Sequence, residues 1–210
     1  PPHLHDRYRR DRRDRPSSAR VLSAWDLLLR HRVDTNILCV VNDGNVGFPL
    51  EVYRYLREAG VEFMQFIPVV ERIDRHGALA PPPRPGDEDL AVTPWSVSPE
   101  GYGRFLCEIF DEWVRRDVGR VFVQFFDLQL GIWAGAPASL CVFAETCGSG
   151  LALEHNGDLY ACDHYVYPEY RLGNIGQTPI GTLAALPRQR QFGLDKKARL
   201  PAACTACRWR

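Results

Sequence analysis

Five of the seven cysteines lie in the last third of the chain, and they are the side chains best suited to chemistry. Cys141 and Cys147 are close in sequence, Cys162 follows a glycine-containing turn, and Cys204 and Cys207 form a Cys-x2-Cys pair. An odd number of unevenly spaced cysteines, without an export signal, favours metal ligands or buried thiols over disulfides. In a small region with little apolar core, a metal can supply the folding free energy.

The spacing of the cysteines does not decide which metal they bind. A zinc site prefers two close pairs of ligands, and only Cys204 and Cys207 satisfy that spacing. Three cysteines around a glycine-rich hairpin favour an iron–sulfur cluster, in which thiolates converge from distant loops. A region that holds no metal at all is the third alternative. Cys39 and Cys107, which fall in a strand pattern and a helix pattern, are expected to be ordinary buried thiols.

Composition excludes several function classes. With 45% hydrophobic residues, the chain can build one ordinary domain and a smaller appendage. Its 26 basic and 26 acidic side chains cancel, which argues against nucleic acid as the main partner. No apolar run approaches the roughly 20 residues of a membrane span, and no signal peptide is evident. We therefore expect a soluble, cytoplasmic protein that binds neither nucleic acid nor membrane.

Helical and extended patterns alternate through the first two thirds of the chain, which predicts an α/β fold. Repeated helix–strand units imply parallel strands joined by crossover helices. Three strands cannot close a barrel, so further β/α units are expected upstream of Pro1. The proline-rich stretch 72–97 is expected to be a loop. Buried strands are expected at 37–41, 63–70 and 121–126, and helices starting near Ser17–Ser18, Pro49 and Ser98.

After Gly131 the character of the sequence changes to glycines, cysteines and short extended pieces. Asn156–Gly157–Asp158 between two apolar runs predicts a β-hairpin. We expect a domain boundary here, with residues 1–136 in the α/β domain and 137–210 in a small cysteine-rich domain.

This cysteine-rich region resembles the start of a SPASM domain, the auxiliary-cluster domain of peptide-modifying radical S-adenosylmethionine enzymes. Stretches 1–9, 65–72 and 95–113 resemble one family within that class, the anaerobic sulfatase-maturating enzymes. The SPASM likeness rests on Cys141-x5-Cys147, the Cys-Asp-His-Tyr-Val run at 162–166, the Leu-Gly-Asn-Ile run at 172–175 and Cys204-x2-Cys207.

The resemblance implies the second half of a partial (β/α) barrel followed by a SPASM domain that is incomplete at its C-terminus. One auxiliary 4Fe–4S cluster would be held by Cys141, Cys147 and Cys162, and a second by Cys204 and Cys207. Further ligands of both clusters would lie beyond Arg210. The chain lacks the Cys-x3-Cys-x2-Cys motif for the catalytic cluster and S-adenosylmethionine. We therefore expect a C-terminal fragment, inactive alone, and assign no S-adenosylmethionine contacts.

The implied reaction converts a Cys or Ser of a sulfatase polypeptide to formylglycine. A 5′-deoxyadenosyl radical takes a Cβ hydrogen, and a base and an electron acceptor complete the oxidation. Asp163 matches the family's proposed base; it would otherwise hydrogen-bond the backbone of its own loop. A flavodoxin or ferredoxin would donate electrons. The alternatives are a SPASM-type maturase of another peptide, and a non-catalytic zinc or iron–sulfur module that binds peptides.

Overall fold

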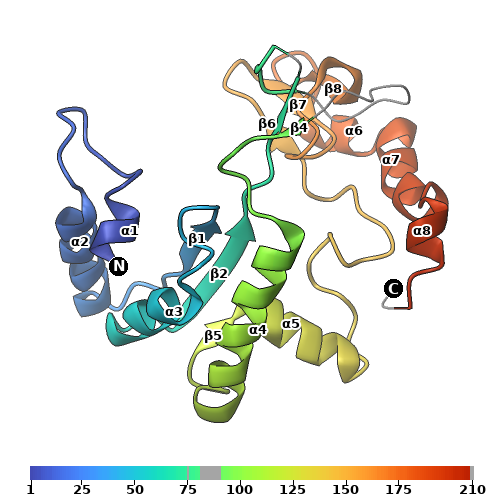
Figure 1. Ribbon diagram of the computed structural model, residues 1–210. Helices are drawn as coiled ribbons and strands as arrows, with labels where there is room; N and C mark the ends of the chain where they lie inside the picture. The colour runs from blue at the N-terminus through green and yellow to red at the C-terminus, as the bar shows by residue number, and fades with distance from the viewer. Residues whose placement is uncertain (75, 81–90, 209–210) are drawn as a thin grey trace. The chain divides into compact units, whose positions relative to one another are not determined.

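The structure, a computed structural model, describes residues 1–74, 76–80 and 91–208 (Figure 1). The chain divides into two compact units, Pro1–Gln129 and Leu130–Arg210. Composition places the domain boundary at 136–137, a few residues further along the chain. Each unit has its own hydrophobic core.

The first unit is built on a parallel sheet in the order β1-β2-β5 (Figure 1). Strand β1 (Ile37–Val41) pairs along its length with β2 (Phe63–Pro68), and β2 pairs with β5 (Phe122–Val123). Helix α3 (Pro49–Glu58) connects the first two strands, and α4 (Pro99–Arg116) precedes the third. These crossovers confirm the α/β fold with parallel strands that the sequence predicts.

The third strand is shorter than expected. Residues 124–126, which we expected to be extended, begin helix α5 (Gln124–Trp133). The Phe126 ring is buried and lies 5.3 Å from both Phe110 and Trp113 of α4. A short apolar run fits a buried strand or a buried helix equally well, so periodicity alone could not separate them.

Helix α2 (Ser18–Arg30) begins where the serines predict, but a different side chain caps it. The Ser17 side chain makes no capping bond. Asp6 instead accepts the backbone N–H groups of Ser17 at 3.0 Å and Ser18 at 2.9 Å. Trp25 is the buried residue of this helix. The other short elements here are α1 (Pro2–His5), β3 (Arg72–Ile73) and β4 (Ala91–Val92).

Strands β3 and β4 pair antiparallel within the stretch 72–97 that we expected to be a loop. The proline run at 81–85 lies outside the described residues. Two-residue strands are compatible with loop-like composition because a ladder this short needs little β-propensity.

Helix α4 contributes large side chains to the core of the first unit. Phe105, Ile109 and Trp113 are at most 1% exposed, as their helical spacing predicts. Ser98 caps the helix, since its Oγ accepts the Gly101 N–H at 3.0 Å. Cys107 was wrongly predicted to be buried: it is exposed, because two positions along a helix turn a side chain to the opposite face from Phe105.

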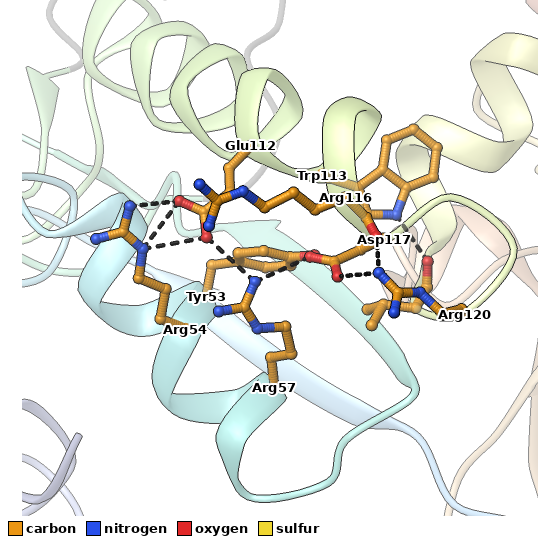
Figure 2. A network of polar contacts seen from close by, with 9 residues as sticks. Tyr53, Arg54, Arg57, Glu112, Trp113, Arg116, Asp117 and Arg120 are labelled. Carbon is orange, nitrogen blue, oxygen red and sulfur yellow. Dashed lines mark hydrogen bonds and ion pairs between the residues drawn. The ribbon is translucent and has the colours of Figure 1, made fainter.

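Helices α3 and α4 are joined by a polar network (Figure 2). The Tyr53 hydroxyl donates to Asp117 Oδ2 at 2.7 Å, and Arg57 contacts both Asp117 and Glu112 at 3.1 and 3.2 Å. Arg54 donates twice more to Glu112 Oε2, at 2.5 and 2.9 Å. Both carboxylates are buried, so these partners replace the water that each has lost.

The same contacts set the protonation of the network. Hydrogen bonds from Arg54 lower the pKa of Glu112. Burial pushes the pKa of Asp117 upward, but the donors Tyr53 and Arg57 outweigh it and the pKa is lowered. Burial and the neighbouring carboxylate raise the pKa of Tyr53. The network therefore consists of ionised carboxylates, a neutral phenol and arginines in fixed contacts. We assign it a structural role.

The second unit contains a small antiparallel sheet in the order β6-β7-β8. The predicted hairpin is confirmed: β6 (Ala152–Leu153) pairs with β7 (Asp158–Tyr160), and Gly157 takes a positive φ of 86° in the turn. Strand β8 (Arg171–Asn174) completes the sheet. The other elements are η1 (Pro168–Tyr170), α6 (Ile180–Ala184), α7 (Pro187–Ala198) and α8 (Ala202–Thr205).

The core of this second unit is small. Its buried apolar cluster consists of Leu159, Ala161, Leu172 and Leu183. So few side chains provide limited stability, which fits the expectation that bound metal contributes to folding here. Among the described residues, no helix combines the length and apolar character that crossing a membrane requires.

Candidate functional site

Strand β7 leads directly into the residues that are best suited to chemistry. Ala161 is buried and its N–H donates to the Tyr170 carbonyl at 3.0 Å, which fixes the end of the strand. The next three residues, Cys162, Asp163 and His164, bring their ligand atoms within 4.8 Å of one another. They are consecutive, so chain connectivity accounts for much of this grouping.

Asp163 is the central acceptor of this group. The Cys162 thiol donates to its Oδ1 at 3.3 Å, and His164 Nδ1 lies 3.0 Å from the same oxygen. The His164 N–H also donates to it, at 3.1 Å. The Asp163 side chain is nonetheless 72% exposed, so a substrate can reach the carboxylate.

The local contacts shift both groups in ways that match. Burial raises the pKa of the Cys162 thiol, and the Asp163 carboxylate and the nearby Cys141 act in the same direction. The pKa of Asp163 is lowered, first because the Cys162 thiol donates to it and further because of His164. Without metal, the pair is therefore a protonated thiol beside an ionised carboxylate.

Cys147 lies in a segment without regular secondary structure that packs on α7. It is half-buried, and its N–H donates to the Gly193 carbonyl at 3.3 Å. The Gln189 side-chain Nε2 donates to the Gly148 carbonyl at 2.8 Å and to the Ala161 carbonyl at 3.0 Å. One amide group thus joins the residue after Cys147 to the residue before Cys162.

The other predicted ligands are exposed. Cys141 lies at the start of the same irregular segment, and its carbonyl accepts a hydrogen bond from Lys196 Nζ. Cys204 lies in α8, and the Cys207 N–H donates to the Cys204 carbonyl at 3.3 Å, which places the pair one helical turn apart. None of the seven cysteines forms a disulfide. In the described part of the chain, the tight ligand group contains Cys162 but not Cys141, Cys147, Cys204 or Cys207.

This donor set fits an iron–sulfur cluster. Thiolates are soft ligands that favour iron–sulfur clusters, zinc or copper over calcium or magnesium. Cysteines around a cluster bind different irons, so they need not converge as tightly as the ligands of one ion. A structural zinc needs four convergent ligands. The tight group here consists of one thiol, that of Cys162, and the two residues that follow it in the chain.

Sequence reasoning missed Gln189, Gly193 and Lys196, which hold the cysteine-bearing segments. Most of α7 is polar, so no apolar periodicity marks its contact face. The available signal is Gly193 itself. A glycine inside a helix costs stability relative to alanine, and one often marks a close approach of another backbone.

Comparison with known proteins matches both units. Residues 141–208 match the SPASM family, an iron–sulfur cluster-binding domain. The chain is 42% identical over 209 residues to the serine-type anaerobic sulfatase-maturating enzyme of Bacteroides thetaiotaomicron, covering 99% of this chain and 50% of that relative. It is 29% identical to the cysteine-type enzyme of Clostridium novyi, covering 98% of this chain and 52% of the relative.

The chain is also similar to solved structures. The structure of native anSMEcpe with bound AdoMet and the Kp18Cys peptide matches with a TM-score of 0.80 and 28% identity. The match covers all of this chain and 54% of that one. The chain thus spans about half the length of the curated relatives it matches.

Proposed function

We propose that this chain belongs to the family of the anaerobic sulfatase-maturating enzymes and, on that premise, that it takes part in oxidising a Cys or Ser of a sulfatase to formylglycine. The observation that carries the proposal is Cys162 beside Asp163, a thiol ligand next to an exposed carboxylate. Residues 1–136 would form part of the barrel, and 137–210 part of the SPASM domain.

The cysteines would hold two auxiliary 4Fe–4S clusters. Cys141, Cys147 and Cys162 would bind one, and Cys204 and Cys207 the other. When bound, such clusters together with S-adenosylmethionine supply the one-electron chemistry of the reaction. The match of residues 141–208 to an iron–sulfur cluster-binding domain supports these assignments.

The chain's own contribution is to take a proton. Oxidation at Cβ of the target residue is easier once its thiol or hydroxyl proton is leaving, and Asp163 Oδ1 is placed to accept that proton. A Cys162 thiolate that ligates a metal has no S–H to donate. Ligation would therefore remove one donor from Oδ1 and free that oxygen for the substrate's proton.

The proposal implies partners outside this chain. The substrate would be a sulfatase polypeptide, and an electron donor such as a flavodoxin or ferredoxin would supply reducing electrons. Both would meet the enzyme in the cytoplasm. The peptide-bound structure of a related enzyme supports a polypeptide substrate.

Replacing Asp163 by Asn in the full-length enzyme tests this function. Asn keeps the shape of Asp but takes up no proton. Iron content and S-adenosylmethionine cleavage should therefore persist, while formylglycine formation falls about 10²- to 10⁴-fold. Product is measured by mass spectrometry on matched Cys and Ser peptides. Loss of a purely structural hydrogen bond would cost about tenfold at most.

His164→Gln is the matched control, since it alters the neighbouring side chain without removing the base. It should keep most of the activity. Near wild-type product from Asp163→Asn would remove Asp163 as the base, and iron lost in proportion to product would assign it a structural role. Wild-type protein that holds zinc, without visible iron–sulfur absorption, would favour a non-catalytic module.

A further inference from the structure

Three residues of α7 face the cysteine-bearing segments. Gln189, Gly193 and Lys196 are spaced four and three residues apart, which puts them on one side of the helix. We call them the positioning face of α7. Each contacts a different part of the site, and together they reach the segments that carry Cys141, Cys147 and Cys162.

Gln189 provides the first contact. It is only 2% exposed, and its Nε2 donates to the carbonyls of Gly148 and Ala161. Carbonyls only accept hydrogen bonds, so the amide must point its NH₂ group toward them. This places a single rigid group between the segment of Cys147 and the strand that ends at Cys162.

Gly193 provides the second contact, through the absence of a side chain. A Cβ at this position would lie 2.1 Å from the Cys147 carbonyl oxygen and 3.0 Å from its carbonyl carbon. Both are backbone atoms, so no side-chain rotation could relieve the clash. The helix backbone and the Cys147 backbone therefore touch directly, and the Cys147 N–H donates across the contact.

Lys196 provides the third contact. Its Nζ donates to the Cys141 carbonyl and, at 2.6 Å, to the Ala144 carbonyl. The neighbouring Lys197 pairs with Glu145 at 2.9 Å. The end of α7 thus fixes the first half of a segment that has no strand or helix of its own.

We propose that the positioning face of α7 sets the spacing of Cys141, Cys147 and Cys162 before any metal binds. The inference rests on the proposed function only in taking these cysteines as cluster ligands. Substituting residues that orient metal ligands typically lowers metal affinity by about 10- to 100-fold. Fixing the segments in advance also removes part of the entropy cost of ordering them around the cluster.

Gly193→Ala in the full-length protein tests the proposal, and Gly181→Ala is the matched control. Gly181 also lies in a helix of this unit, but nothing lies within 4 Å of the Cβ it would gain. In metal-free protein, amide exchange over 141–150 should be at least about tenfold faster in Gly193→Ala than in wild type. Gly181→Ala should match wild type. Unchanged exchange in β1 and β2 verifies that the rest of the chain remains folded.

Iron and sulfide are then measured after anaerobic reconstitution. Gly193→Ala should retain one cluster fewer than wild type and Gly181→Ala. Wild-type iron in Gly193→Ala would overturn the proposal even if exchange is faster, and so would exchange that matches Gly181→Ala. If wild-type protein takes up no iron, the proposed function fails, while the exchange contrast still decides whether α7 holds these segments.

Gln189→Glu provides a second, independent variant. It keeps the size of the side chain but points oxygens at both carbonyls, so exchange over 141–150 should rise and iron should fall as in Gly193→Ala. Gln191→Glu makes the same change on an exposed position of α7, where it removes only a hydrogen bond to Asp195 of the same helix, and it should leave both unchanged. Equal behaviour of the two glutamate variants would contradict the assigned role of Gln189.

Discussion

Cys39 and Cys107 carry the same thiol in opposite surroundings. Cys39 lies in β1, where it is half-buried against the core of the first unit, and this burial raises its pKa to about 11. Cys107 is exposed on α4. Because the thiolate is the reactive form, burial and a raised pKa both make Cys39 the slower nucleophile.

We expect iodoacetamide at pH 8 to alkylate Cys39 at least about tenfold more slowly than Cys107, since a pKa near 11 leaves only about one thiolate per thousand thiols. Peptide mass spectrometry over a time course measures both rates in one sample. The two cysteines should react alike in urea. Equal rates in the folded protein would show that β1 opens readily or that Cys39 is not shielded.

At the residue scale, the sequence predicts the candidate ligands and the candidate base well. It predicts poorly the side chains that position them. The cysteines and Asp163 stand out because their types and spacing suit metal and proton chemistry. The Asp6 cap and the Gln189 bridge join residues at least 11 positions apart. Such contacts depend on tertiary packing, which no local pattern encodes.

The N-terminus of α4 shows how a single hydroxyl contributes to an element. Ser98 accepts the Gly101 N–H, one of the donors that the first turn of a helix leaves unpaired. Ser17 occupies the same position on α2 without a capping bond from its side chain. The two serine side chains therefore differ in how much they stabilise the helices that they start.

Ser98→Ala should lower the free energy of unfolding by about 1 kcal/mol, the usual cost of a lost serine cap. Ser17→Ala should cost clearly less, because Asp6 continues to accept the N–H groups at that end. Urea unfolding followed by tryptophan fluorescence measures both. If the two variants lose the same stability, the hydroxyl of Ser98 is not an effective cap.

Periodicity predicts α3, α4, β1 and β2 well, because the apolar residues of each pack into one core. It fails at 124–126, where a short aromatic run becomes the start of α5. It also gives no account of α7, whose contact face consists of an amide, a glycine and an ammonium group. Polar positioning contacts leave no hydrophobic signature.

At the scale of the whole molecule, acid should weaken both units through different carboxylates. Glu112 and Asp117 have lowered pKa values in the first unit, and Asp158 has a pKa of about 2 in the second, mainly because Arg171 donates to it. A carboxylate whose pKa is lower when folded adds stability above its unfolded pKa. That stability is lost as the pH falls through the folded value.

Glu112→Gln tests this directly. It should destabilise the protein at pH 7, because an amide pairs less strongly with Arg54 and Arg57. Its stability should then fall less steeply than that of wild type below about pH 4.5, since one linked carboxylate is gone. Urea unfolding at several pH values measures the slopes, with exposed Glu108→Gln as control. Parallel slopes for wild type and Glu112→Gln would contradict the linkage.

Glycines, cysteines and short extended pieces mark the change of character in the sequence, and the two compact units divide at Gln129 and Leu130. The sequence could not indicate that the irregular segment 141–148 depends on a helix far along the chain. Only the folded backbone brings Gly193 against Cys147.

That dependence has a consequence for how the protein is made. Lys196 lies 55 residues after Cys141, whose carbonyl it holds. At typical translation speeds the ribosome needs roughly 3 to 11 seconds to cover that stretch. Over this interval the first cysteine moves away from the site of synthesis without the helix that arranges it. Iron delivered in that window would meet thiols that the helix has not yet arranged, so we expect the helix to form before metal binds.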